Sequence, residues 1–477
     1  MVRTPYCLNQ DLISAQRPVE TGPCGSCVLR ACLQYVRSPK VSPSLRVELL
    51  LEVPQVRILF GCQFYAPSVG GVQEVMRQLA EQLVARGHQV TVATTKLPAR
   101  DFQTLNGVDI KEFNVSGNLV SGMAGEIEQY QAYAMTSDFD AVMIMAAQQW
   151  TFDALWPVLD RIKYPKVFMP CGFSGLYEPA YAKYFQELPG VLRKIDRLVF
   201  HSTKYRDIDF ARKHGITNFS VIPCGASEDW FNVAVDASFR ARQGIPEQSF
   251  LFLTVGSFTG LKGHLELANA FSRLELAEGQ HATLILNGND VQVLDRSMGG
   301  LLCKFVGLIR TYGVQGSFRH ILKKSLGTGA SPKKIALLVN QSQPNKLVLV
   351  TDFPRLELTQ AFIAADLFVF ASNIEYSPLV LYESAAAGTP FLSVSVGNSE
   401  EIARWTGAGV ICPSTVDERG YTRVNEAVLA RSMAELMQQR DRLAELGAIG
   451  KKNWSERFTW KKIATQYEHI IQQSIKS

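Results

Sequence analysis

Residues 56–95, VRILFGCQFYAPSVGGVQEVMRQLAEQLVARGHQVTVATT, decide the fold class of this chain. The run opens with apolar residues typical of a buried strand, continues into a segment with a helical period, and ends on a second strand-like run. In the middle segment, apolar residues recur at three- and four-residue spacing and share one helix face: Val72, Val75, Met76, Leu79 and Leu83. Gly87 follows them, where a helix commonly ends. The stretch therefore predicts a strand–helix–strand unit of a parallel sheet.

The same alternation of strands and helices runs through most of the chain. It is interrupted in the turn-rich residues 222–249 and then begins again. Two such series predict an α/β protein with two Rossmann-like doubly wound domains facing across a cleft. The expected divisions are a poorly ordered N-terminal extension at 1–50, a first domain at 51–235, a second domain at 236–450 with a basic insertion at 291–346, and a final helical segment at 451–477.

The composition is that of an ordinary globular protein. The 477 residues are 47% hydrophobic and 19% charged, which excludes disordered and fibrous classes. No apolar run approaches the roughly 18 residues that a membrane-spanning helix needs. No apolar segment of a secretory signal follows Arg3. We therefore expect a cytoplasmic protein, with the inner face of the membrane as a further place of action, and no disulfides.

Four of the nine cysteines lie near the N-terminus: Cys7, Cys24, Cys27 and Cys32. A Cys-x-x-Cys pair is a common half of a zinc site. The other two cysteines form no second close pair, and no His is near them. We therefore expect no metal site here.

Positive charge is concentrated in one segment. The net charge is +5, yet residues 291–350 contain nine Lys or Arg and one acidic residue, Asp295. Apolar residues accompany these cations in 298–324, a composition typical of a helix at a membrane interface. We expect peripheral contact with an anionic membrane, although the apolar side could equally pack on the second domain. No motif or basic face predicts a nucleic-acid partner.

Gly70 and Gly71 stand at the start of the first predicted helix. Paired glycines let a ligand come close to the backbone, and a helix N-terminus offers unpaired N–H groups to an anion such as phosphate. A tight turn would use the same pair. The loop is not a G-x-G-x-x-G sequence, and the chain has no Walker A sequence, so neither NAD nor P-loop chemistry is predicted.

A second glycine-rich loop, VGSFTGLKGH at residues 255–264, places Lys262 between Gly260 and Gly263. The loop follows a predicted strand and precedes a predicted helix. A lysine in this position can pair with a diphosphate lying across the sheet edge. The alternative is an exposed charge in a glycine turn.

The segment SNIEYSPLVLYESAAAGTPFLS, residues 372–393, combines two carboxylates with a helix start. Glu375 leaves a predicted strand and Glu383 lies on the next helix, whose first turn offers the N–H groups of Leu379 and Val380 to phosphate oxygens. This suits a nucleotide sugar, with Glu375 toward the sugar and Glu383 toward the ribose. A glycoside hydrolase would need its carboxylates about 5 to 9.5 Å apart, whereas eight helical residues span about 12 Å.

Together with ERFTWKKIATQYEHI near the C-terminus, these blocks resemble retaining glycosyltransferase family 4. The similarity covers roughly residues 56–290 and 347–475, and its most specific part is Glu-x7-Glu followed by Gly-Thr-Pro. It implies a GT-B fold, an NDP-sugar donor, no cofactor and no obligatory metal, and retention of anomeric configuration. It also implies that the last helix crosses back to the first domain. Applied to this chain, it makes Glu375 catalytic and gives as donor-binding residues Gly70, Gly71, Lys262, Ser377, Leu379, Val380 and Glu383.

The chain departs from the family pattern beside Lys262. Many relatives carry an Arg shortly after the glycine of this loop, paired with the lysine on the diphosphate. Here Ser257 and Phe258 occupy those positions, so half of the usual pair of cations is missing.

The acceptor side departs as well. The His that often follows the strand near residue 145 is replaced by Gln148 or Gln149, and a His-Gly pair after the next strand is replaced by Cys171 and a glycine. We therefore assign no catalytic His. Ser174 and Tyr177, together with Gln148, are the acceptor-side candidates, with a structural role as the alternative.

The predicted function is that of a retaining, metal-independent glycosyltransferase of the hexosyl type. It would move a sugar from an NDP-sugar to a glycan or lipid-linked acceptor in polysaccharide or glycolipid synthesis. The alternative is a catalytically weak member that binds a nucleotide sugar or glycan as a scaffold or regulator, favoured by the missing Arg and His residues.

Overall fold

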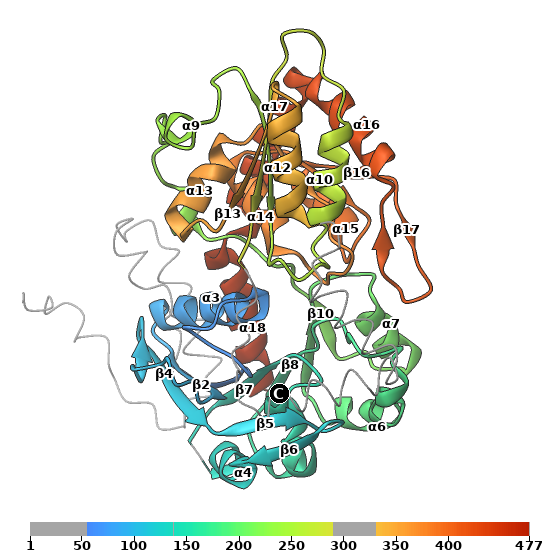
Figure 1. Cartoon of the computed structure of the whole chain (residues 1–477). Coiled ribbons are helices and arrows are strands. Elements are labelled where there is room, and N and C mark those ends of the chain that lie inside the picture. The colour runs from blue at the N-terminus through green and yellow to red at the C-terminus, as the bar shows by residue number, and fades with distance from the viewer. Residues whose placement is uncertain (1–54, 137, 290–330, 477) are drawn as a thin grey trace, which may run out of the picture. The chain divides into compact units, whose positions relative to one another are not determined.

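Two sheets of mainly parallel strands organise the chain (Figure 1). The computed structural model describes residues 55–136, 138–289 and 331–476, and from Val56 onward these belong to one unit. The expected N-terminal extension, with its cysteine pair, lies outside the described residues, as do residues 290–330. The two doubly wound α/β domains predicted from the alternation are confirmed.

The first sheet has eight strands, which are β1 (Arg57–Gly61), β2 (Gln89–Thr95), β3 (Thr104–Leu105), β4 (Val108–Phe113), β7 (Ala141–Met145), β8 (Lys166–Met169), β9 (Arg197–Phe200) and β10 (Phe219–Val221). Their order in space is β10-β9-β8-β7-β1-β2-β4-β3. All pairs are parallel except β3 with β4. In the central register, Phe60 of β1 lies opposite Val92 of β2 and Met143 of β7.

The helices of this first domain are α3 (Gly71–Ala85), α4 (Ile127–Thr136), α5 (Trp150–Asp153), α6 (Ala182–Leu192) and α7 (Arg206–Lys213), with 3-10 turns at Trp156–Arg161 and Pro179–Tyr181. The short helices α8 (Glu228–Phe231) and α9 (Phe239–Arg242) follow in the chain, and both contact α13 (Arg355–Ala364) of the second domain. A separate hairpin pairs β5 (Val115–Asn118) with β6 (Gly122–Gly125). Helix α3 buries Val75, Met76, Leu79 and Leu83 of the predicted apolar face. Gly87 follows it at φ 93°, a conformation that favours glycine and ends the helix.

The second sheet has six strands, which are β11 (Phe250–Val255), β12 (Ala282–Asn287), β13 (Lys346–Thr351), β14 (Leu367–Phe370), β15 (Phe391–Val394) and β16 (Gly409–Cys412). They are all parallel, in the order β13-β12-β11-β14-β15-β16. The helices with them are α10 (His264–Arg273), α12 (Pro332–Ser342), α13 (Arg355–Ala364), α14 (Leu379–Ala387) and α15 (Ser399–Thr406), and a small hairpin joins β17 (Thr415–Val416) to β18 (Thr422–Arg423).

The C-terminal part of the predicted insertion is not an insertion, because it contains helix α12 of the second domain. It buries Ile335, Ala336 and Val339, and it packs on β13 and α10. Lys346, the last residue of the predicted insertion, already begins β13. Residues 332–346 are therefore a crossover helix and strand start of the second domain, which the mixture of lysines with a short apolar pattern concealed.

The chain closes with α16 (Glu426–Met437), α17 (Arg440–Asn453), a π-helical turn (Trp454–Phe458) and α18 (Trp460–Lys476). Helix α18 lies beside α3 of the first domain (Figure 1). Glu468 of α18 accepts hydrogen bonds from Arg86 Nη1 at 3.0 Å and pairs with His88 Nε2 at 2.8 Å. The last helix thus belongs to the first domain by its contacts.

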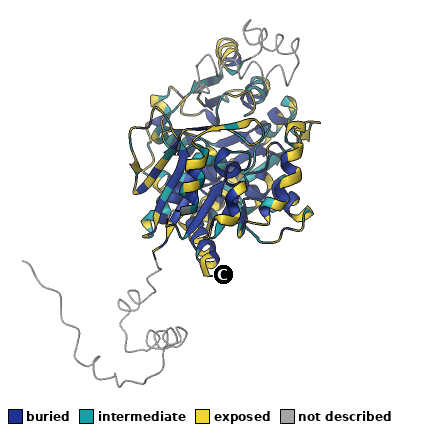
Figure 2. Cartoon of the chain, turned by 90° about the horizontal axis from the view of Figure 1, so that it is seen from below, coloured by how far each residue is buried: buried dark blue, intermediate teal, exposed yellow. Residues whose placement is uncertain are grey.

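Burial follows the layers of each sheet. Figure 2 shows the central strands in the buried colour, with helices outside them that expose only their outer sides. No helix among the described residues is both long enough and apolar enough to cross a membrane.

In both sheets the strand order reverses beside the first strand. In the first sheet the order turns back between β1 and β7, and in the second between β11 and β14. Loops that leave these strand pairs diverge to opposite faces, so a crevice forms at the carboxyl ends of the strands. This is where ligand-binding residues are expected in each domain.

Candidate active site

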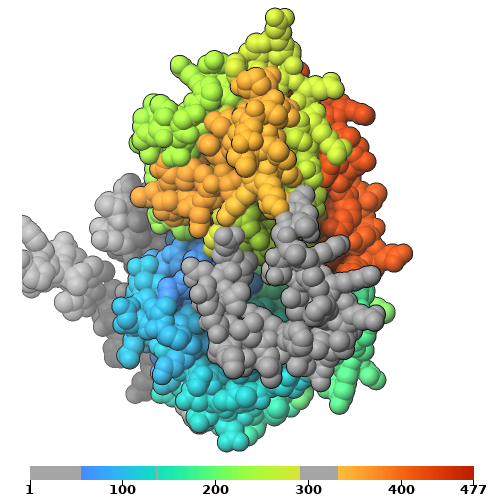
Figure 3. All heavy atoms as spheres, viewed as in Figure 1, coloured from blue at the N-terminus to red at the C-terminus, as the bar shows by residue number. Residues whose placement is uncertain are grey.

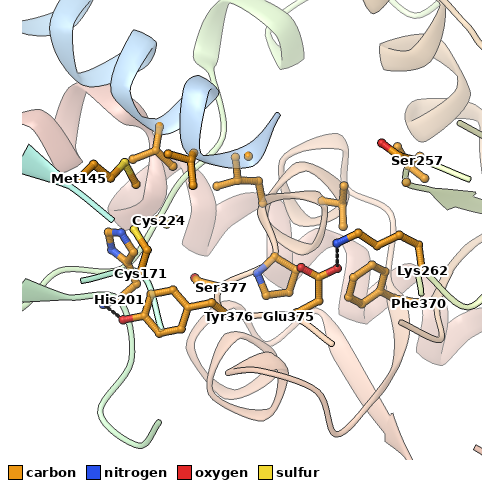
Figure 4. Close-up of a pocket in the computed structure, with 18 residues that line it drawn as sticks. Met145, Cys171, His201, Cys224, Ser257, Lys262, Phe370, Glu375, Tyr376 and Ser377 are labelled. Atoms are coloured by element: carbon orange, nitrogen blue, oxygen red, sulfur yellow. Dashed lines mark hydrogen bonds and ion pairs between the residues drawn. The ribbon is translucent and has the colours of Figure 1, made fainter. Parts of the chain in front are cut away.

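A cavity of about 310 Å³ lies at the reversal points of both sheets. Met145 at the end of β7 contributes from the first domain, and Val255 and Phe370, at the ends of β11 and β14, from the second. Figure 4 shows side chains of both domains around it. The cavity therefore brings together loops from the two halves of the sequence.

The N-terminus of α3 forms one wall. Gly71 and the next residue, Val72, line the cavity, whereas Gly70 is the residue just before the helix, with extended backbone. A Cβ on Gly71 would meet no protein atom within 4 Å. The neighbouring protein therefore does not require this glycine for space, and the small residue leaves the helix end open to a ligand.

Lys262 and Glu375 meet in the cavity. Lys262 Nζ donates to Glu375 Oε1 at 2.6 Å (Figure 4). Ser372 Oγ donates to the same oxygen at 3.0 Å. Lys262 is the only Lys or Arg among the described residues that line this cavity. The structure thus brings together two predicted site residues that lie 113 positions apart in the chain.

Gly263 explains how the lysine loop reaches this place. It has φ 74°, and a Cβ there would lie 2.0 Å from the backbone oxygen of Ala371. Only glycine combines this conformation with so close an approach to the loop that precedes Glu375.

Helix α14 begins at the position where an anion-binding helix end was predicted. Pro378 directly precedes the helix, and Ser377, Leu379 and Val380 line the cavity. Because the first N–H groups of a helix have no partner within it, this end can accept phosphate oxygens. Glu375 stands just before it, so one carboxylate and one helix terminus face the same space.

Glu383 lies deeper on α14 and is not among the residues that line the cavity. Its side chain is 9% exposed, and its Oε1 accepts from Arg355 Nη2 at 2.6 Å. The sequence offered no signal for Arg355, because the contact joins the start of α13 to the middle of α14.

The acceptor-side candidates form a neighbouring group in the first domain. Gln148 Oε1 accepts from Ser174 Oγ at 3.3 Å and from Gly175 N at 3.1 Å. Tyr177 is 73% exposed, with the Arg206 guanidinium 5.5 Å from its ring centroid. None of the three candidates lines the cavity itself.

The loops that carry these candidates hold unusual backbone conformations. Four of the five non-glycine residues with positive φ in the described chain lie there, namely Ala146, Gln148, Cys171 and Phe173. Such conformations cost of order 1–3 kcal/mol each and concentrate at functional sites. The loops lie beside the cavity and contain these strained residues, and both facts favour a binding role for them.

Sequence reasoning missed the residues that tie the two domains together beside Glu375. Tyr376 accepts a hydrogen bond on its hydroxyl from the backbone N of His201 at 2.9 Å (Figure 4), and the Tyr205 hydroxyl donates to the backbone oxygen of Glu375 at 2.6 Å. The position of His201 at the end of the strand-like run RLVFH, residues 197–201, was the available signal. Burial lowers the pKa of His201, and its Nδ1 pairs with the Ile222 carbonyl at 2.9 Å.

The part of the chain that the structure describes contains no group of three or more His, Cys, Asp or Glu side chains suited to a metal ion. The chemistry that the described site can offer is therefore that of a carboxylate, a lysine and helix termini, which together fit a diphosphate-linked sugar.

Two Rossmann-like domains that share a cavity at their reversal points, with a C-terminal helix packed on the first domain, define the GT-B class of glycosyltransferases. Residues 69–230 match the family described as Glycosyltransferase Family 4, and residues 235–453 match Glycosyl transferases group 1. The chain belongs to glycosyltransferase family 4, a family of retaining, metal-independent enzymes. The resemblance stated from the sequence is confirmed.

Solved structures support the same fold. Sucrose-phosphate synthase from Thermosynechococcus elongatus aligns with a TM-score of 0.64 at 17% identity, over 88% of this chain and 99% of its own. The Anabaena protein HepE, in complex with UDP-glucose, aligns with a TM-score of 0.60 at 14% identity, over 88% of this chain and all of its own. At such identities the likeness shows the fold alone.

Among curated proteins, the chain is similar to D-inositol 3-phosphate glycosyltransferase of Thermobispora bispora. The two are 34% identical over 123 residues, and the match spans 26% of each chain. The chain thus matches about a quarter of this relative's length.

Proposed function

We propose that this protein transfers a sugar from an NDP-sugar to a glycan or a lipid-linked acceptor, with retention of anomeric configuration and without a metal ion. The observation that carries the proposal is the meeting of Lys262, Glu375 and the N-terminus of α14 in one cavity between the domains. A diphosphate needs cations and N–H donors, and its attached sugar needs a hydrogen-bond acceptor beside them.

The residues divide the donor between them. The N-termini of α14 and α3 and the Lys262 ammonium hold the diphosphate, and Glu375 accepts hydrogen bonds from the sugar hydroxyls. Glu383 accepts from the ribose. In the transfer, the bond from the anomeric carbon to the diphosphate oxygen breaks, and a bond to the acceptor oxygen forms on the same face. The acceptor proton passes to the leaving diphosphate oxygen, so the step needs no further base.

The ion pair between Lys262 and Glu375 has a consequence for donor binding. Lys262 is bonded to Glu375, so a bound diphosphate must draw the ammonium away from the carboxylate. Glu375 is then free to accept from the sugar. In this arrangement the binding of the donor diphosphate also releases the Glu375 carboxylate from Lys262.

A panel of radiolabelled NDP-sugars tests the proposal, beginning with UDP-glucose because HepE binds it. The wild-type protein should transfer or slowly hydrolyse one donor, and Glu375→Gln should bind that donor but not turn it over. Binding without turnover by the wild type would identify the scaffold or regulator of the alternative instead. No binding of any donor would contradict both.

The outer face of α12 supports a proposal for the kind of acceptor and for the place where the enzyme acts. This helix lies at the surface of the second domain (Figure 3), where Leu337 is 58% and Leu338 63% exposed and Lys333 and Lys334 are exposed beside them. Exposed leucines among lysines suit the interface of an anionic membrane. We therefore place the enzyme in the cytoplasm at the membrane surface, acting on a lipid-linked acceptor in polysaccharide or glycolipid synthesis.

Flotation with anionic vesicles at low salt tests this placement. The double variant Leu337→Ser/Leu338→Ser should bind less than the wild type, whereas Val416→Ser, which changes an exposed residue of β17, should not. Absence of binding by the wild type, or equal binding by all three proteins, would overturn it.

A further inference from the structure

Glu383 does not stand alone in the donor site. Its carboxylate is nearly buried, and the Arg355 guanidinium holds Oε1 at 2.6 Å. Arg355 itself is 31% exposed at the side chain and begins α13. A buried carboxylate with a charged, hydrogen-bonded partner is held in a single orientation.

Trp230 fixes the guanidinium in turn. The Arg355 Cζ lies 3.3 Å from the centroid of the Trp230 ring, a stacking distance, and 5.8 Å from that of Phe231. A planar guanidinium that stacks on an aromatic face loses little further freedom when it forms a hydrogen bond. Lysine at this position would provide the charge but not the stacked plane.

The stacking platform is itself anchored. Trp230 belongs to α8, and Glu228 of the same short helix accepts from the backbone N of Trp460 at 3.1 Å and of Lys461 at 3.2 Å. Arg77 of α3 lies 5.4 Å from the same Trp ring. The platform is therefore held by the first domain's helix α3 and by the start of α18.

We infer that Arg355, stacked on Trp230, is a positioning and specificity-determining residue. It holds one oxygen of Glu383 so that the carboxylate presents its other oxygen to the ribose hydroxyls of the donor nucleotide. The inference rests on the ribose role proposed for Glu383 and adds the residue that makes that role selective. Discrimination between ribose and 2′-deoxyribose would therefore depend on Arg355, although Arg355 need not touch the nucleotide.

The test measures nucleotide binding by calorimetry, without turnover. UDP, GDP and ADP are titrated first, and whichever binds is compared with its 2′-deoxy counterpart. A hydrogen bond to a charged carboxylate should make the wild type prefer the ribonucleotide by at least about tenfold. In Arg355→Gln this preference should fall below about threefold, with the affinity for the 2′-deoxy form changing less than about threefold. Trp230→Leu, which keeps the ion pair and removes the platform, should give an intermediate preference.

A control variant and the pattern of the two affinities distinguish a positioning role of Arg355 from a purely structural one. Arg242→Gln removes another ion-paired arginine, which bonds Asp236 and Glu357, and it should keep the wild-type preference. Arg355→Gln that weakens both nucleotides equally, or neither, would overturn the inference, because a purely structural role would not alter discrimination.

Glu383→Ala distinguishes a failure of the inference from a failure of the proposed function. If Glu383→Ala loses the preference and Arg355→Gln keeps it, the inference alone is wrong. If Glu383→Ala keeps the preference, or if none of the three nucleotides binds, the donor site is wrongly assigned and the role of Arg355 is overturned with it.

Discussion

At the scale of single residues, the site depends on one cation. The family resemblance led us to expect an Arg where this chain has Ser257 and Phe258, and among the described residues that line the cavity Lys262 is the only Lys or Arg. A charge-assisted hydrogen bond in a sheltered cleft contributes roughly 1.5–3 kcal/mol. If the proposed donor site is right, diphosphate recognition depends mainly on this lysine and on the helix termini.

Lys262→Ala should weaken binding of the matching nucleoside diphosphate at least about tenfold, measured by calorimetry. Lys204→Ala, which removes an exposed lysine outside the cavity, is the control and should bind normally. An unchanged dissociation constant in Lys262→Ala would mean that another group takes the diphosphate charge.

The buried carboxyl of Asp207 should make the free energy of unfolding depend on pH. Burial raises the pKa of its carboxyl to about 6, while hydrogen bonds from Tyr376 and from the N–H groups of Gly172 and Ile208 oppose the rise. The unfolded group loses its proton near pH 3.9. Between about pH 4 and 6 the folded state therefore binds more protons, and its stability falls as the pH rises, by at most about 3 kcal/mol.

Asp207→Asn should remove this fall, so that the variant gains stability relative to the wild type between about pH 4 and 7. Urea unfolding at several pH values measures it. Asp209→Asn, on the same helix but exposed, should follow the wild type. Parallel curves for the wild type and Asp207→Asn would show that the buried carboxyl has no such effect. Asp153, whose pKa burial also raises to about 6, contributes equally to all three proteins.

At the scale of elements, the glycine loop before α10 decides where Lys262 stands. Gly260 and Gly263 both have positive φ, but a Cβ on Gly260 would meet nothing within 4 Å, whereas one on Gly263 would lie 2.0 Å from a backbone oxygen. An alanine at Gly260 would therefore suffer backbone strain alone, whereas an alanine at Gly263 would suffer the same strain and a steric collision.

Gly263→Ala should cost more than about 2 kcal/mol in the free energy of unfolding and weaken nucleotide binding, because the loop must move away from the strand end that leads to Glu375. Gly260→Ala should cost only about 1 kcal/mol and leave binding nearly unchanged. Denaturant unfolding and calorimetry measure both quantities. Equal effects of the two substitutions would contradict the close packing at Gly263.

At the scale of the whole unit, hydrogen bonds across the domains hold the loop after β9 against the second domain. Glu401 of α15 accepts from Ser202 Oγ at 2.5 Å and from Thr203 N at 3.1 Å. Asn398 Nδ2 donates to the His201 carbonyl at 2.9 Å. These bonds lie next to the Glu375–Tyr376 loop, because Asn398 N also donates to the Tyr376 carbonyl, so the relative position of the domains and that of the Glu375 carboxylate are connected.

Glu401→Ala should loosen this contact and increase the radius of gyration of the ligand-free protein, measured by small-angle X-ray scattering. It should also destabilise the protein by about 3 kcal/mol, since it leaves buried donors unpaired. Glu400→Ala is the matched control and should change neither quantity, because the hydrogen bond of Glu400 within the described residues comes from Ser395 of its own domain. An unchanged radius in Glu401→Ala would show that other contacts keep the domains together.

The sequence by itself determined the α/β class, the two doubly wound domains and the family. Period-two and period-3.6 patterns are local, as in the helix that buries Val75 and Leu79. The Glu-x7-Glu block was legible for the same reason, since a strand end, Pro378 and the helix of Glu383 follow one another directly in the chain. The loop glycines around Lys262 were likewise visible as local turn chemistry.

Only the tertiary structure decided which side chains meet. Lys262 reaches Glu375, Arg355 reaches Glu383 and Tyr205 reaches the Glu375 carbonyl across separations that no periodicity encodes. Helix α12 belongs to the second domain because its apolar side is buried against β13. A count of charges along the sequence cannot show this contact. Such contacts depend on how two sheets and their loops pack in three dimensions, and pairs of residues far apart in the chain carry no mark of their partners.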